Sequence, residues 1–312
     1  QVLLLAIIIL IASVLIAELY VFLPGLLGGI TLYILSREMY FRLVEGKKWK
    51  RGGTALLFIL AFVVIISGPI YLSIRLASPS INELLNNQQS IVNNLQTFSE
   101  KVKDNVGIEL LSEENIKALG EKITVVIPQL LNSTAGVLAN LLIMLFLLYY
   151  LLTSGRQVEK YLTRIIPLEN KNIHLLAKET KSMIKANALG IPIISIIQGI
   201  TAAFGYWVFG VSDWAMWGFI TGVFAFFPIV GTMIIWIPIV ISLYTKGMNW
   251  PATGLGLYSL IITGNIDYVA RMSLLKKLGD VHPMVTVLGV IVGLSLFGFM
   301  GLIFGPLLIS YF

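Results

Sequence analysis

Long apolar stretches without a charged residue alternate along the chain with short basic segments. A helix of about 20 apolar residues spans a hydrocarbon core of roughly 30 Å, because an α-helix rises about 1.5 Å per residue. The stretches that meet or approach this length are Gly52–Ile74, Ile123–Gly155, Ala186–Ser212 and Gly247–Ile266. Residues 1–36 are also apolar but are interrupted at Leu23-Pro24-Gly25, which predicts a hairpin. The pattern therefore predicts an all-α, polytopic helical membrane protein.

Two uncharged segments near the C-terminus have the wrong length for simple spans. Trp214–Thr245 is divided by FFPIVG (Phe226–Gly231), and Pro283–Phe312 is divided by LFGFMG (Leu296–Gly301). Each arm has about 14 residues, or roughly 21 Å of helix, so one arm is too short to cross and both together are too long. We expect two broken, re-entrant hairpins. Paired broken helices of this kind indicate a transport site.

Two polar stretches interrupt the membrane pattern. Ile81–Val106 carries apolar residues at helical spacing along one face, and a second helix is expected after Ser112. These helices would form a small extramembrane layer that either packs on itself or mediates self-association. Leu168–Asn187 has apolar residues on one face and lysines on the other, which is typical of a helix lying on the inner leaflet or of a solvated linker helix.

The positions of the basic residues predict the topology. Most of the 22 Lys and Arg residues fall in three clusters, within residues 37–51, 156–185 and 271–277, which we place inside the cell. The hairpin at 214–245 would then enter the membrane from outside, and the hairpin at 283–312 from inside. The expected divisions are an N-terminal scaffold (1–74), extramembrane helices (75–128), a span plus a basic interfacial helix (129–187), and a transport unit (188–312).

Composition excludes several function classes. The chain is 57% hydrophobic and 12% charged, its net charge is +6, and it has no Cys. A basic charge suggests nucleic acid in a soluble protein, but here it lies in loops beside apolar spans, so we expect a lipid bilayer and no nucleic acid as partner. HExxH, GxSxG and Gly-rich phosphate-loop motifs are absent from the sequence. We therefore expect no catalytic residues, metal or cofactor, and a protein that is not an enzyme.

The breaks of the two hairpins are the first candidate binding positions: Pro228, Gly231, Gly298 and Gly301. Proline frees a helix carbonyl, and a helix that starts after a break presents bare N–H groups. Such groups attract cations or anionic and oxygen-rich solutes, respectively. Glycines spaced four apart in the last hairpin also have a simpler use, because they allow two helices to approach closely.

Polar residues at the depth of the spans are the second set of candidates. Asp267 and Arg271 lie four residues apart, so they share a helix face, where they form either an internal salt bridge or a contact to substrate or ion. Asn265 and Gln198 add uncharged polar groups, which either bind a solute or hold helices together.

Five segments of the chain are informative in their order: FLLYYLLTSGRQVEKYLTRIIP, IIQGITAAFGYWVFGV, FAFFPIVGTMIIWIP, NIDYVARMSLL and VHPMVTVLGVIVGLSLFGFMGLIFGPLL. Together they resemble the autoinducer-2 exporter family of bacterial and archaeal membrane proteins. One departure is Ala270-Arg271-Met272, where the family more often has Leu-Arg-Pro. The resemblance implies a homo-oligomeric transporter of the cell membrane, with a pentamer expected. Some members are assigned to autoinducer-2 export and others to Na+(Li+)/H+ exchange.

From these patterns we expect a secondary transporter that exports a small polar molecule, similar to autoinducer-2, by alternating access. The first alternative is a Na+(Li+)/H+ antiporter in which Asp267 titrates, so that a monovalent cation and a proton replace the polar solute. The second alternative is a non-transporting oligomeric scaffold that assembles through residues 76–128.

Overall fold

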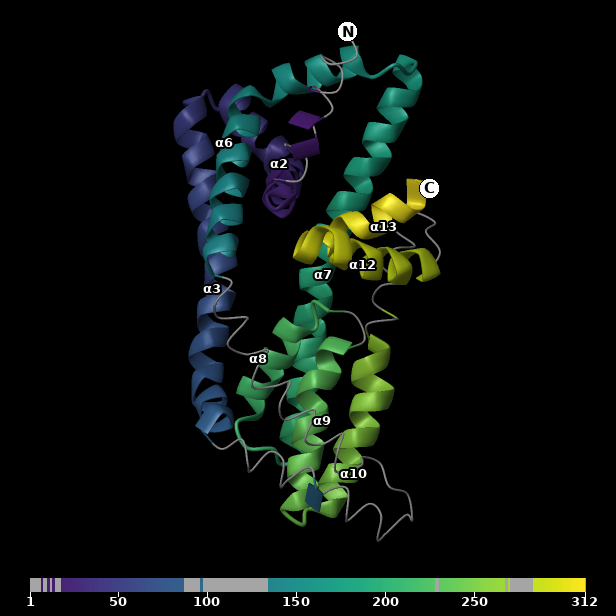
Figure 1. The fold of residues 1–312 in the computed structure, drawn as a ribbon. Coiled ribbons are helices and arrows are strands. Elements are labelled where there is room, and N and C mark those ends of the chain that lie inside the picture. Colours follow the sequence, from purple (N-terminus) through teal and green to yellow (C-terminus); the bar gives the residue numbers. More distant parts are fainter. Residues whose placement is uncertain are drawn as a thin grey trace. The chain divides into compact units, whose positions relative to one another are not determined.

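A computed structural model (Figure 1) describes residues 18–86, 134–227, 230–266 and 283–311, together with isolated positions outside these ranges. None of the described residues lies in a strand, and three helices are long and apolar enough to cross a membrane. These helices confirm the prediction of an all-α membrane protein. The chain divides into two compact units. Unit 1 comprises Gln1–Val64, Thr134–Ala188 and Leu275–Phe312, and unit 2 comprises Ile65–Ser133 and Leu189–Leu274.

Unit 1 is built around α2 (Leu23–Phe41) and α6 (Thr134–Ile165), which pack side by side. A short π-helical segment follows α2, and α3 (Arg51–Asn86) begins after it. Aromatic and leucine side chains and one alanine of these helices form one buried core: Tyr33, Tyr40, Ala55, Phe58, Leu148, Leu151 and Leu152. The predicted break at Leu23-Pro24-Gly25 is confirmed, because the chain turns at Val21 and Phe22 before α2 begins. Pro24 lies in the first helical turn, where its missing N–H removes no helix hydrogen bond.

One asparagine side chain closes this N-terminal break. The Gly25 N–H donates to Asn140 Oδ1 at 2.8 Å, and Asn140 Nδ2 donates to the Val21 carbonyl at 3.0 Å. A Cβ added to Gly25 would lie 2.5 Å from the backbone oxygen of Asn140, so no side chain fits between the helices there. The amide of α6 therefore supplies the donor and the acceptor that the interrupted backbone lacks.

Replacing Asn140 with leucine is expected to destabilise unit 1. The change leaves the Gly25 N–H and the Val21 carbonyl without this partner, at a cost of about 1–3 kcal/mol. Thermal unfolding in detergent should therefore occur at a lower temperature. Thr153→Val is the matched control on the same helix, because the exposed Thr153 hydroxyl bonds only to carbonyls of its own helix. Equal melting temperatures for Asn140→Leu and wild type would contradict the role of the amide.

The long helices extend further than the sequence pattern predicted. α3 continues without a break to Asn86, so the start of the expected outer helix at Ile81 belongs to α3, and most of residues 87–133 lie outside the described part. α7 is one helix over Asn170–Val208, so the helix predicted for Leu168–Asn187 continues without a break into the following span, and its place on the inner leaflet stays a prediction. The physical reason is local: the chain between Lys185 and Pro192 has no helix breaker stronger than a single glycine, and an unbroken helix keeps its backbone bonds paired.

The C-terminal hairpin of unit 1 consists of α12 (Pro283–Phe297), a short 3-10 turn (Gly298–Met300) and α13 (Gly301–Tyr311). The break predicted at LFGFMG is confirmed, and Gly298 makes the turn with φ +56°. The arms have 15 and 11 residues, which corresponds to roughly 22 and 16 Å of helix, less than the roughly 30 Å of a hydrocarbon core. The two arms lie side by side (yellow in Figure 1).

Interlocking glycines hold these two arms together. A Cβ on Gly301 would overlap the carbonyl group of Gly293, and one on Gly305 would overlap the carbonyl of Gly289. The Tyr20 hydroxyl donates to the carbonyl of Leu296, at the end of α12. The four-residue glycine spacing thus packs helix against helix, as expected. The Tyr20 hydroxyl thus provides a partner for one backbone carbonyl next to the break.

Unit 2 contains the second half of α7 together with α8 (Trp214–Phe224), α9 (Val230–Thr245) and α10 (Asn249–Tyr258), the green helices of Figure 1. They share one apolar core, formed by Ala202, Tyr206, Val211, Ile220, Ile235, Ile239, Leu243, Ala252 and Leu255. The break predicted at FFPIVG is confirmed, since α8 ends at Phe224 and α9 begins at Val230. A Cβ on Gly231 would overlap the Phe224 carbonyl, so glycine is required where the arms turn back.

Candidate functional site

The contacts between α7 and α10 define how these two helices are aligned. A Cβ on Gly254 would overlap the Phe209 ring, and one on Gly205 would overlap the Tyr258 ring. The Tyr258 hydroxyl donates to the Thr201 carbonyl at 2.9 Å. Along this contact the residue number falls by four on α7 as it rises by four on α10. The two helices therefore run antiparallel.

Further contacts show how α8 is aligned with α7 and how α9 is aligned with α10. A Cβ on Gly222 would lie 3.0 Å from the Ser195 carbonyl, so Ser195 is level with the last turn of α8 and with the start of the break. On α9, Tyr244 and Thr253 share a hydrogen bond of 2.6 Å, and Val240 lies beside Gly256. Extending this alignment by two helical turns brings Thr232 level with Thr263.

These alignments place polar side chains from three helices at the broken end of the unit 2 core. We call Ser195, Gln198, Thr232 and Thr263 the polar layer. All four are buried: Ser195 and Gln198 are 3% exposed, Thr232 is 5% exposed and Thr263 is 1% exposed. Within the described part of the chain, three buried side-chain atoms have no hydrogen-bond partner: Ser195 Oγ, Gln198 Oε1 and Thr263 Oγ1. All three belong to the polar layer.

The unpaired state of the two hydroxyls is unusual for this protein. Several other helical Ser and Thr hydroxyls among the described residues donate to the carbonyl four residues earlier, as Ser36 does to Leu32 at 2.6 Å and Thr54 does to Lys50 at 2.9 Å. This bond is local and is open to most helical hydroxyls. Ser195 and Thr263 do not make it. A buried polar group without a partner costs about 1–3 kcal/mol, so such groups indicate a site that receives water or a solute.

The backbone changes directly after α10, at the polar layer. Residues Ser259–Thr263 form a π-helical segment, in which the Gly264 N–H donates to the Ser259 carbonyl five residues earlier. Ser259 is buried as well. Short π segments inside α-helices are frequent at functional sites, because the extra residue changes the direction of the side chains. The sequence of this segment, SLIIT, contains no residue that predicts a π-helical segment.

The residues predicted from sequence have different positions in the structure. Gln198 belongs to the polar layer, and Gly231 lies at the adjoining break. Asn265 is exposed on the same helix as Thr263 and donates to the Ile261 carbonyl at 2.7 Å. Pro228, Asp267 and Arg271 lie outside the described residues.

Gly298 and Gly301 lie in the other unit, where the positive φ and the helix contact described above account for glycine at both positions. Sequence reasoning missed Ser195, Thr232 and Thr263. The available signal was the spacing of Ser195 and Gln198, which are three residues apart on one apolar helix.

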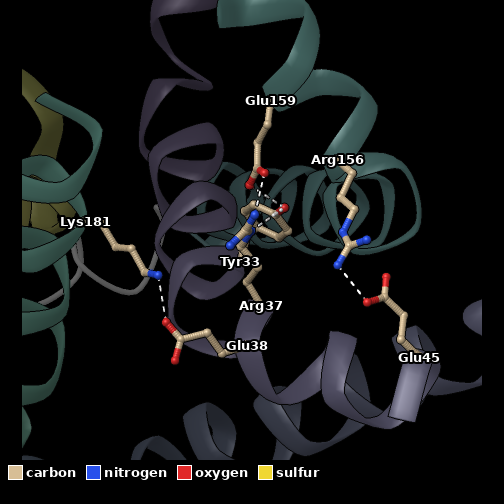
Figure 2. A network of polar contacts seen from close by, with 7 residues as sticks. All are labelled: Tyr33, Arg37, Glu38, Glu45, Arg156, Glu159 and Lys181. Carbon is tan, nitrogen blue, oxygen red and sulfur yellow. Dashed lines mark hydrogen bonds and ion pairs between the residues drawn. The ribbon is translucent and has the colours of Figure 1, made fainter. Parts of the chain in front are cut away.

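A second polar cluster lies in unit 1 and joins α2, α6 and α7 (Figure 2). Arg37 pairs with Glu159, and the Tyr33 hydroxyl donates to the same carboxylate at 2.9 Å. Arg156 pairs with Glu45 at 2.7 Å. These ion pairs and the hydrogen bond join α6 to α2 and to the π-helical segment that follows α2.

Glu38 extends this cluster to α7. It accepts hydrogen bonds from Lys181 at 2.7 Å and from Lys185 at 3.0 Å. The hydrogen bond from Lys181, followed by that from Lys185, lowers the pKa of Glu38 to about 2. The side chain is 54% exposed, so solvent screening limits what the contact contributes to stability.

Glu38→Gln is expected to lower the stability of unit 1 by less than about 1 kcal/mol at neutral pH. Because the folded pKa lies below the unfolded value of about 4.3, the contribution is fully present above that value and is lost as the pH falls through about 2. The difference in melting temperature between variant and wild type should stay constant from about pH 8 to pH 5 and shrink below about pH 4. A difference that changes between pH 8 and pH 5 would contradict this assignment.

Comparison with known proteins identifies the family. A sequence model described as "AI-2E family transporter" matches residues 3–312. The chain belongs to the AI-2E transporter family. The match spans both units and includes the polar layer, the two broken hairpins and the charge cluster of Figure 2.

Individual relatives agree with this assignment. An Aquifex aeolicus protein is 28% identical over 74% of this chain and 67% of its own length, and its name is "Putative transport protein". A Methanocaldococcus jannaschii transport relative is 26% identical over the same shares of both chains. A Helicobacter pylori relative is 30% identical over 56% of this chain and 53% of its own length. Membrane transport is therefore the general role of this AI-2E protein.

Proposed function

We propose that this AI-2E family protein is a secondary transporter that exports a small polar molecule by alternating access, and that the polar layer contacts the solute. The observation that carries the proposal is the set of three buried, unpaired oxygens on Ser195, Gln198 and Thr263. A solute with hydroxyl or amide groups supplies the missing partners while it occupies the site. The broken hairpin beside the layer supports this assignment, since such breaks accompany transport sites.

The chemistry of the layer suits an uncharged or weakly charged polar solute. Its described side chains are hydroxyls and an amide, which both donate and accept hydrogen bonds. The resemblance to autoinducer-2 exporters makes an autoinducer-2-like molecule the first candidate. We propose a homo-oligomer, with a pentamer expected, in the cell membrane.

Na+(Li+)/H+ exchange is the second candidate, and a specific feature favours it. The unpaired atoms are all oxygens, and hard cations bind oxygen ligands. In this case Asp267 would carry the exchanged proton. A scaffold without transport activity is less well supported, because unpaired polar atoms in a closed core would lower stability without a function.

The test uses purified protein reconstituted into liposomes. Vesicles loaded with autoinducer-2 should release it faster than protein-free vesicles, and the release should fall when Gln198 is replaced by leucine. Proton movement that depends on a Na+ or Li+ gradient, without autoinducer-2 release, would favour the antiporter. A folded oligomer that moves neither solute would overturn the proposal in favour of a scaffold.

A further inference from the structure

The loop between α2 and α3 carries a dense positive charge. Within Arg42–Arg51 the basic residues outnumber a single acid, Glu45, and Arg156 of α6 already pairs with Glu45 at 2.7 Å. The basic residues of this loop are all exposed: Arg42, Lys47, Lys48, Lys50 and Arg51. Among the described residues, no acidic partner neutralises these five side chains. We call residues 42–51 the basic loop.

The backbone of the basic loop is held by hydrogen bonds. The N–H groups of Lys47 and Trp49 both donate to the Leu43 carbonyl, at 3.1 and 3.3 Å. The hydroxyl of the buried Tyr40 donates to the Arg51 carbonyl at 3.0 Å. The charged side chains are therefore presented from an ordered segment, which reduces the conformational entropy lost when they bind a partner.

The position of the basic loop points to the membrane surface. α3 begins at Arg51, and residues Arg51–Leu76 form a candidate membrane span. The loop that precedes this span must lie near the plane of the lipid headgroups. Trp49 is 44% exposed within the loop, and tryptophan side chains are enriched at this depth.

We propose that the basic loop binds the phosphate headgroup of an anionic phospholipid, of the phosphatidylglycerol type. The loop and the lipid have opposite charge. A zwitterionic lipid carries no net charge to match the unneutralised side chains, so the loop discriminates by charge. Each basic residue near an anionic membrane surface strengthens binding by about fivefold at moderate ionic strength. The site lies in unit 1 and is independent of the solute assigned to the polar layer.

The test compares two variants with the same change in charge. In the loop variant, Lys47, Lys48 and Lys50 are each changed to glutamine. In the control variant, Lys160, Arg164 and Lys171, which are exposed basic residues elsewhere in unit 1, are changed to glutamine. Each purified protein is titrated with phosphatidylglycerol or phosphatidylcholine in mixed micelles, and bound lipid is counted by native mass spectrometry.

The loop variant should lose its preference for phosphatidylglycerol by at least about tenfold, and by a clearly larger factor than the control variant, whose basic residues lie on α6 and α7 and not in the basic loop. Equal losses in both variants would overturn the proposal, because they would show general attraction to a positive protein. If the loop variant retains its preference for phosphatidylglycerol, the proposal is also overturned. An acidic protein segment would then be the remaining candidate partner of the basic loop. If the loop variant fails to fold, Lys48→Gln alone should still reduce the preference about fivefold, whereas Lys48→Arg should preserve it.

Discussion

Gly301→Ala is expected to disrupt the C-terminal hairpin. The added Cβ would overlap the carbonyl carbon and oxygen of Gly293 on the facing helix. These are backbone atoms, so no change of side-chain rotamer relieves the overlap, and the two arms must separate. We expect a loss of about 3 kcal/mol, the upper end of the usual cost of overpacking, seen as a large drop in melting temperature and in the yield of monodisperse protein. Gly305→Ala should behave in the same way, because its Cβ would overlap the Gly289 carbonyl.

Gly68→Ala and Gly136→Ala are matched controls for this prediction. Both glycines are helical, and a Cβ at either position meets no atom within 4 Å. Alanine is a better helix former than glycine by about 1 kcal/mol, so these variants should be as stable as wild type or more stable. If Gly301→Ala melts at the same temperature as the controls, the close packing of the hairpin arms is wrong.

The double change Ser195→Ala and Thr263→Val is expected to reduce solute flux by at least about tenfold, because each hydroxyl would lose a hydrogen bond to the solute. The same change should leave stability unaltered or raise it by about 1–3 kcal/mol, since it removes two buried groups that have no partner in the protein. Flux and melting temperature are measured on the same reconstituted preparation. This separation of activity from stability distinguishes a solute contact from a packing role.

Thr201→Val provides the control for the hydroxyl changes. The Thr201 hydroxyl lies on α7 as Ser195 does, but it already donates to the Ile197 carbonyl at 2.9 Å. Its loss should leave flux nearly unchanged. A fall in flux as large as that of the double variant would indicate a general effect of removing hydroxyls from the helices. Unchanged flux in the double variant would contradict the assignment of the polar layer.

Local sequence signals predicted the helix breaks correctly. Proline and glycine act within a few residues, so Leu23-Pro24-Gly25, FFPIVG and LFGFMG each mark a break that the structure contains. The close approach of the two hairpin arms was also expected from the four-residue spacing of the glycines, whereas the pairing of Gly293 with Gly301 is seen only in the structure. The sequence did not predict that α7 is continuous, because no strong breaker separates its charged half from its apolar half and the two halves differ in composition.

The polar layer was only partly predictable. Gln198 stands out as an amide in an apolar span, whereas serine and threonine usually bond to their own helix and carry little information. Whether Thr263 makes that local bond depends on the π-helical segment around it, which reflects packing and not a sequence motif. The position of Thr263 near the turn of α7 that carries Gln198 depends on contacts between helices far apart in the sequence, such as Phe209 with Gly254.

The most direct test of the polar layer is its accessibility to a small solute. The chain contains no cysteine, so a single cysteine can report on one position. A cysteine at Ser195 should react with a small, water-soluble thiol reagent at least about tenfold faster than one at Ala202, which lies seven residues further along the same helix and packs in the apolar core. Autoinducer-2 should slow the reaction at Ser195. Equal, slow rates at the two positions would show a closed core and would contradict the transport site.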